Sequence, residues 1–160
     1  MLGGQRLSGD ELYWKERLKG LVTLPVLPGD RARPPVSSFL RGTLVAPARR
    51  GFSEAVQSLS RRHATTPLTV LVAGLHALVF RYTLQEDVLV GLSVSPSGGV
   101  GEGGTESSNI VYLRTDLSGG PSGADLMKRA GDTLEGARSH ASFPFASAAR
   151  HLSLQPGGSM

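Results

Sequence analysis

The sequence predicts an α/β domain in which helices flank a mixed sheet. Helical and strand patterns follow one another in the order helix, strand, helix, helix, strand, strand, helix. The strongest patterns are an apolar helical stretch that begins after Thr66 and two short β-branched stretches at 88–94 and 109–117. With 160 residues, 39% of them apolar and 19% charged, the chain can bury a core and has the composition of a soluble globular protein.

The first half of the chain predicts two helices and one strand. We expect one helix at 10–18 with Asp10 as its N-terminal cap, and another that is capped by Ser53 and ends near His63. Residues 25–35 contain four prolines, which favour an extended segment because proline fixes φ and lacks an N–H donor. Residues 39–46 (FLRGTLVA) alternate in polarity and predict a strand.

The helix that begins at Thr66 and Pro67 is the clearest element, since threonine is a favoured N-cap and proline is favoured at the first helical position. Its apolar side chains recur with the helical period; they are Leu68, Leu71, Val72, Leu75, Leu78, Val79 and Tyr82. We therefore expect this helix to be the most buried element, with His76 as a hydrogen-bonded core residue. Leu75→Ala or Leu78→Ala should then cost roughly 2–5 kcal/mol.

The second half predicts two strands and a helix. Residues 88–94 (VLVGLSV) are apolar enough for a strand buried on both faces, and residues 109–117 (NIVYLRTDL) form a second strand after a glycine-rich loop. The last helix begins at Pro121 and Ser122 and ends near Ser139. Its inner face should hold Leu126, Ala130, Leu134 and Ala137. Residues 1–9 and 153–160 carry no structural signal and are expected to be disordered, which leaves 10–152 as the domain.

Composition narrows the classes of function. The chain has no cysteine, which excludes disulfides, a thiolate zinc site and a cysteine nucleophile, and agrees with a cytoplasmic location. Its arginines are scattered apart from two short groups, 49–50 and 61–62, so we expect no nucleic-acid partner; a basic binder is supported only by the pI near 10. We expect no signal peptide, because residues 1–10 contain no apolar run. We expect no membrane span, because the longest apolar stretch, 67–80, is too short.

Two patterns resemble chemical sites without meeting their requirements. Gly99, Gly101 and Gly104 match the dinucleotide-binding spacing, but that site needs a helix immediately after the glycines and a strand follows here. Serines such as Ser93 lack the G-x-S-x-G setting of a nucleophile. We expect no metal site.

Several segments, in this order along the chain, resemble the condensation domains of nonribosomal peptide synthetases. They are YWKERLKG (13–20), LPGDRARP (27–34), LHALVFRYTLQEDVLVGLSVS (75–95), NIVYLRTDLSGGPS (109–122) and HASFPF (140–145). The residues that match the family motifs and for which a structural role is expected are Tyr13, Trp14, Asp30, Arg31, His140, Pro144 and Phe145. The resemblance also implies that the strand carrying Asn109 and Arg114 lines a tunnel, which makes these two the candidate site residues.

The resemblance implies a fold like that of chloramphenicol acetyltransferase, with two α/β lobes that face each other across the tunnel. It implies amide bond formation between acyl or peptidyl and aminoacyl thioesters, which arrive on the phosphopantetheine arms of carrier protein domains. No cofactor is expected to bind directly.

The family's active-site motif, H-H-x-x-x-D-G, is not found in the sequence, whose histidines are His63, His76, His140 and His151. We therefore expect no catalytic residue and no activity from this chain alone; it would be the first part of the second lobe and would need a first lobe as partner. The alternative is a non-catalytic relic or a module that binds carrier proteins. We also expect self-association, because one of the two strands at 88–94 and 109–117 should have an unpaired edge.

Overall fold

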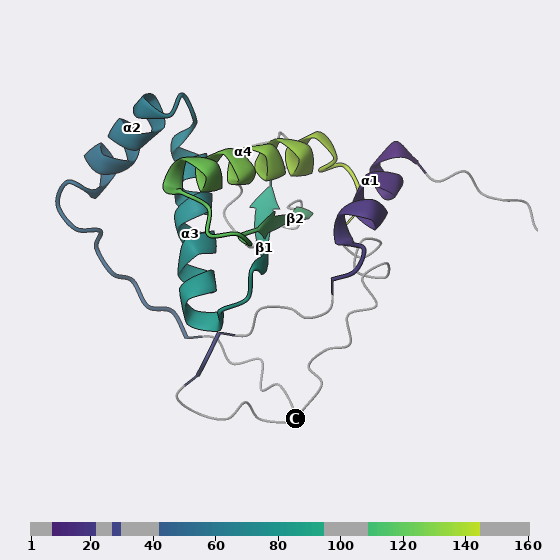
Figure 1. The fold of residues 1–160 in the computed structure, drawn as a ribbon, viewed down its shortest axis with the longest axis horizontal. Coiled ribbons are helices and arrows are strands. Elements are labelled where there is room, and N and C mark those ends of the chain that lie inside the picture. The colour runs from purple at the N-terminus through teal and green to yellow at the C-terminus, as the bar shows by residue number, and fades with distance from the viewer. Residues whose placement is uncertain (1–7, 22–26, 30–41, 95–108, 145–160) are drawn as a thin grey trace, which may run out of the picture.

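The computed structural model describes residues 8–21, 27–29, 42–94 and 109–144, whose helices and strands surround one small core (Figure 1). The elements are α1 (Gly9–Leu18), α2 (Phe52–Arg62), α3 (Pro67–Thr83), β1 (Asp87–Val94), β2 (Asn109–Asp116) and α4 (Gly123–Ser139). The predicted α/β class is confirmed. In Figure 1, α3 and α4 lie beside the sheet, and α1 lies near the C-terminal end of α4.

The two strands pair in antiparallel register, with Val90 opposite Leu113. Because side chains alternate along a strand, Val88, Val90 and their cross-strand neighbours Thr115 and Leu113 share one face of the sheet. That face is covered by helices, since the Thr115 hydroxyl lies 3.3 Å from the hydroxyl of Thr133 on α4. The prediction that this strand is buried on both faces is confirmed only near its start, where the neighbouring residues Val88 and Leu89 are both buried. Gly91, further along β1, is exposed.

Helices α3 and α4 pack closely because small residues lie between them. A Cβ atom at Gly131 would meet the Thr69 methyl group at 3.5 Å. The expected inner face of α4 is confirmed, and Thr133 belongs to it as well. The buried side chains of α4 are Leu126, Ala130, Thr133, Leu134 and Ala137.

Of the three helix caps that the sequence predicts, only Thr66 is confirmed. The Thr66 hydroxyl accepts from the backbone of Thr69, and Ser122 forms a reciprocal capping box with Asp125. The cap of α1 is Ser8 rather than Asp10, and α2 begins after Gly51 with no side-chain cap instead of at Ser53.

The prediction of which residues α3 buries was right for Val72 and Val79 and wrong for four of the seven named. Leu71, Leu75, Leu78 and Tyr82 are 42–62% exposed and form an apolar stripe along one side of the helix, which we call the α3 stripe. The residues that α3 buries are Thr69, Val72, Ala73, His76 and Val79. Periodicity could not distinguish the two sides because both are apolar, and contact with the small residues of α4 decides which side turns inward.

The prediction of a strand at 39–46 is also wrong for its described residues, 42–46. Residues 42–46 have no regular structure, and Leu44 and Val45 are 92% and 87% exposed. An alternating segment stays irregular when no neighbouring strand pairs with it. Residues 39–41, most of the proline-rich segment, the glycine-rich loop, the first seven residues of the expected disordered start (1–9) and the expected disordered tail (153–160) lie outside the described residues. Ser8 and Gly9 were also expected to be disordered, but they cap and begin α1.

In the part of the chain that the structure describes, no single helix is long and apolar enough to cross a membrane. Helices α2 and α3 satisfy length and composition only as a pair, and they are bent by 104° relative to each other.

Candidate functional site

Arg114, one of the two candidate site residues, links β2 to β1 and to the end of α1. Its Nε and Nη2 atoms donate to the two carboxylate oxygens of Asp87 at 2.8 and 2.6 Å, a forked geometry that only a guanidinium provides. Its Nη1 atom donates to the carbonyls of Arg17 and Lys19 at 2.9 and 2.8 Å. Because these carbonyls end a helix and lack intrahelical partners, Arg114 acts as their cap.

The electrostatics of this pair favour the ionised forms. Hydrogen bonding to Asp87 raises the pKa of Arg114 above its usual value, partial burial opposes the shift, and the carboxylate charges of Asp87 and Asp116 reinforce it. The side chain of Arg114 is only 19% exposed and that of Asp87 is 44% exposed, so most of the arginine side chain is buried by protein atoms.

The backbone of β2 is held from outside the sheet by side chains of α1 and α4. Arg17 donates from Nη2 to the Arg114 carbonyl and to the Thr133 hydroxyl, both at 2.6 Å, and Thr133 also donates to that carbonyl at 3.0 Å. Further along, Arg129 of α4 donates to the Asp116 carbonyl at 2.7 Å. These bonds attach both helices to the same strand.

His140, which follows α4, is held by the first turn of α1. Its Nδ1 atom lies 2.7 Å from the Asp10 carboxylate, whose other oxygen accepts a bond from the Ser142 hydroxyl. The bond from Ser142 is the largest of the effects that hold the pKa of Asp10 below its usual value, and the bond to His140 acts in the same direction. The sequence prediction treated Asp10 only as a helix cap and missed this role.

Two aromatic residues of α1 complete the contact with His140. The Tyr13 ring stacks on the imidazole with ring centres 4.0 Å apart, and the Trp14 indole donates to the His140 carbonyl at 2.9 Å. Trp14 is 2% exposed and packs edge-to-face on Tyr112 of β2. The family-motif residues of α1 therefore serve as its anchor to α4 and β2.

Asn109, the other candidate site residue, fastens the segment after α4 to the start of β2. Its amide nitrogen donates to the carbonyls of Ala141 and Phe143, both at 2.7 Å, and its amide oxygen accepts from the backbone of Ile110 at 3.0 Å. Asparagine suits this position because it can donate and accept at once.

The structure thus connects residues that are far apart in sequence. Tyr13, Trp14 and His140, the pair Arg114 and Asp87, and Asn109 form three neighbouring sets of contacts on α1, β2 and the end of α4, which together we call the motif network; it also contains residues that the sequence analysis did not single out. Those residues are Asp10, Arg17, Asp87 and Thr133. Of the remaining predicted residues, Pro144 is exposed, and Asp30, Arg31 and Phe145 lie outside the described residues.

The geometry of the motif network supports structure rather than reaction. The network bonds join side chains to the backbone or to other side chains of the same chain, so these groups already have protein partners. Among the described residues there is no cluster of histidine and acidic side chains that could hold a metal ion.

His76 is a core residue, as predicted, but its contact with the backbone of Leu113 lacks the geometry of the expected hydrogen bond. It is fully buried, and neither ring nitrogen reaches a partner with hydrogen-bonding geometry. Burial lowers its pKa to about 4, an effect that the backbone of Leu113 offsets only in part. The histidine is therefore neutral near pH 7 and closed off from any substrate.

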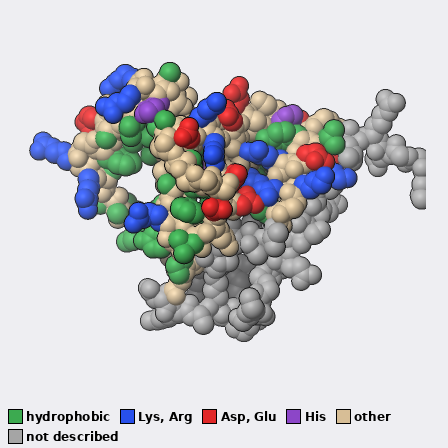
Figure 2. Space-filling model, viewed as in Figure 1, with side chains coloured by type: hydrophobic (Ala, Val, Ile, Leu, Met, Phe, Trp, Pro, Cys, Tyr) green, Lys and Arg blue, Asp and Glu red, His purple; other side chains and the backbone are tan. Residues whose placement is uncertain are grey.

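A groove of about 750 Å³ lies between the α2–α3 turn and α4. Its charged lining residues carry both signs, with Lys128 and Arg138 beside Asp132 and Glu135. Figure 2 shows a similar mixture over the visible face, where blue and red side chains are interspersed.

The comparisons with known proteins agree on one family. The model of the condensation domain matches residues 1–158. The chain is 36% identical over 159 residues to one of the linear gramicidin synthase subunits of Brevibacillus parabrevis and 32% identical over 145 residues to malpibaldin synthetase of Mortierella alpina. These matches cover 96% and 88% of this chain, yet the chain spans only about 3% of the length of each relative.

Solved structures show the same fold. The X-domain from teicoplanin biosynthesis matches with a TM-score of 0.78 at 24% identity, covering 96% of this chain and 35% of that one. The first condensation domain of the calcium-dependent antibiotic synthetase matches with a TM-score of 0.65 at 22% identity, covering 90% of this chain and 33% of that one. The chain therefore belongs to the condensation domain family of nonribosomal peptide synthetases.

Proposed function

We propose that this chain forms the first part of the second lobe of a condensation domain and acts only together with the rest of such a domain. In the proposed reaction the amine of an aminoacyl thioester attacks the carbonyl of an acyl or peptidyl thioester. A C–N bond forms and the C–S bond breaks. The amine loses one proton, and the departing sulfur gains one and leaves as a thiol. Both substrates arrive on the phosphopantetheine arms of carrier protein domains in the cytoplasm, and no cofactor is held by this chain itself.

The motif network is the observation that carries this proposal. The residues by which the sequence resembles the family hold α1, β1, β2 and α4 together. Asn109 and Arg114 are therefore proposed as positioning residues that keep β2 in place as a wall of the tunnel. Because the sequence lacks the family's histidine-pair motif, we propose that the general base for the amine comes from the first lobe.

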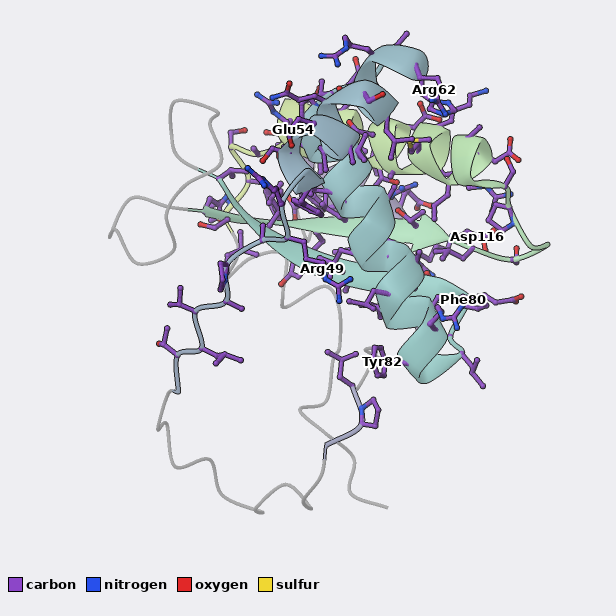
Figure 3. The ribbon with its side chains drawn as sticks, turned by 90° about the vertical axis from the view of Figure 1, so that its left-hand side faces the viewer. Arg49, Glu54, Arg62, Phe80, Tyr82 and Asp116 are labelled. Carbon is purple, nitrogen blue, oxygen red and sulfur yellow. The ribbon has the colours of Figure 1, made fainter. Side chains whose placement is uncertain are left out.

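The α3 stripe supports the need for a further body of protein. Four large apolar side chains lie along one side of a helix, and in Figure 3 Tyr82 extends from the lower end of α3, clear of the two strands. Full burial of one such side chain contributes about 1.5–3 kcal/mol, so covering the stripe would stabilise a complex strongly. The chain spans about a third of the solved domains that share its fold, and we propose that the remaining two thirds cover the stripe.

Split-domain complementation tests this proposal. A homologous condensation domain that lacks the segment equivalent to this chain is produced separately, and its binding to this chain is measured by titration calorimetry. We expect binding that Leu78→Asp weakens at least about tenfold, because the change places a charge in the covered stripe. Arg81→Asp is the matched control, since it places the same charge on an exposed position of the same helix.

Two results would contradict the proposal. If wild-type chain does not bind the remainder of the domain, the reading as a non-catalytic relic gains support. If Leu78→Asp and Arg81→Asp bind as tightly as wild type, the α3 stripe is not part of the contact.

A further inference from the structure

We propose that the side chains of Arg17, Thr133 and Arg129 prevent a strand of another chain from pairing with the outer edge of β2. We call these three side chains the edge guard. The guard consists of hydrogen bonds between described residues, so it is independent of the proposed function. Two features establish it: the backbone groups of β2 that point away from β1, and the side chains that bind those groups.

The register of the sheet determines which groups of β2 point outward. The backbone N–H of Leu117 donates to the carbonyl of Glu86 at 2.7 Å, so these two residues form a hydrogen-bonded pair. Hydrogen-bonded and non-hydrogen-bonded pairs alternate along an antiparallel ladder, which places Asp116 and Arg114 in non-hydrogen-bonded pairs. The backbone N–H and C=O groups of Asp116 and Arg114 therefore point away from β1.

The outward carbonyl of Arg114 is bound by two donors from different helices. Arg17 of α1 donates from Nη2 at 2.6 Å, and Thr133 of α4 donates from its hydroxyl at 3.0 Å. A carbonyl oxygen has two lone pairs, and these two bonds use both of them. Thr133 is 3% exposed, and its hydroxyl also accepts from Arg17 at 2.6 Å, so the two donors hold each other in place.

The outward carbonyl of Asp116 is bound by Arg129 of α4. The Nη1 atom of Arg129 donates to this carbonyl at 2.7 Å and to the carbonyl of Ser118 at 3.2 Å, so the guanidinium spans the end of the strand. Arg129 and Arg17 are both half-buried, which places their side chains against the strand rather than in open solvent.

A strand that paired with this edge would have to displace the guard. Paired strands lie about 4.7–4.9 Å apart, and each outward carbonyl has to accept an N–H of the incoming strand. The guard fills that space and binds those carbonyls, and cationic side chains at an edge are a device by which proteins prevent strand pairing. The strand needs such a device because residues 109–113 (NIVYL) are uncharged and rich in β-branched and aromatic side chains, which favour pairing between chains.

Arg17→Met tests the guard, because it removes the guanidinium donors and keeps an unbranched side chain. We expect a second copy of the variant chain to pair with β2. Amide hydrogen exchange at increasing protein concentration should then show the outward amides of Arg114 and Asp116 exchanging about tenfold more slowly once about nine tenths of the chains are paired. The amides of Leu113 and Thr115 point toward β1 and should change much less. In the wild-type chain none of these four amides should respond to concentration.

Four further variants separate an open edge from other causes of association. Arg62→Met is the matched control, since it makes the same change at an exposed position of α2. Leu134→Ala weakens the core and leaves the guard intact, so it controls for loss of stability alone. Arg17→Lys keeps a donor and a charge and should behave like wild type. Arg129→Met opens the Asp116 carbonyl without touching α1, and it replaces Arg17→Met if circular dichroism shows that the latter does not fold.

Three results would overturn the proposal. The first is concentration-dependent protection of the Arg114 and Asp116 amides in the wild-type chain, because a guarded edge should not pair. The second is the absence of such protection in folded Arg17→Met and Arg129→Met variants. The third is equal protection in Leu134→Ala, because loss of stability rather than an open edge would then explain the association.

Discussion

A pair of identical substitutions on two helices gives the sharpest test of the packing. Leu134 on α4 is 5% exposed, and Leu78 on α3 is 51% exposed. Leu134→Ala removes a buried isobutyl group and leaves a cavity, so it should lower the free energy of unfolding by about 2–5 kcal/mol. Leu78→Ala removes a side chain that is only half buried and leaves no cavity, so its cost should stay below about 1 kcal/mol.

Urea denaturation measures both effects in one experiment. The only tryptophan, Trp14, is 2% exposed and lies in the core, so its fluorescence reports on tertiary unfolding, and circular dichroism follows the helices. The transition midpoint should fall far more for Leu134→Ala than for Leu78→Ala, with similar slopes for both. If the two substitutions cost the same, or Leu78→Ala costs more, the stripe side of α3 is the buried side and the assignment of faces is wrong.

Three further predictions concern the motif network and the core. Arg114→Lys should lower the free energy of unfolding by about 1–3 kcal/mol in urea titrations. An ammonium group cannot form two parallel hydrogen bonds to the Asp87 carboxylate and also reach the carbonyls of Arg17 and Lys19. An unchanged transition midpoint would contradict this prediction. Gly136→Ala should not bring the roughly 1 kcal/mol of stability that alanine usually gains over glycine within a helix, because its Cβ would lie 2.6 Å from the Tyr13 hydroxyl. In the Tyr13→Phe background the same substitution should recover that gain, which a double-mutant cycle measures. The pKa of His76 is 6.5 in the unfolded chain and about 4 in the folded chain, so between these pH values the unfolded chain binds a proton that the folded chain does not. The free energy of unfolding should therefore drop by about 3 kcal/mol as the pH falls from 6.5 to 4. Denaturation curves of His76→Leu should lack that part of the pH dependence.

The helices could be predicted where local chemistry determines them. The cap at Thr66 with Pro67 behind it depends on residues within one turn, so the sequence reveals it directly. The capping box of Ser122 and Asp125 depends on equally local residues, but the sequence analysis did not identify it. The inner face of α4 was also predictable, because charged residues occupy its other side and leave one apolar face.

The features that could not be predicted depend on distant neighbours. Apolar residues lie on both sides of α3, so only tertiary packing selects the side that is buried. The segment at 42–46 alternates like a strand but has no strand beside it. Arg17 reaches Arg114 across 97 positions of sequence and Asp10 reaches His140 across 130, distances at which no local pattern operates. The family motifs identified several members of the network and could not show how they are joined.

The central claim is that this chain supplies structure to a condensation domain and no reacting group of its own. The most direct test is an amide-formation assay with loaded donor and acceptor carrier proteins, in which the dipeptide product is measured by mass spectrometry. We predict product at the level of the enzyme-free control for the chain alone, and product above that level when the remainder of a condensation domain with its histidine pair is added. Turnover by the chain alone would contradict the account.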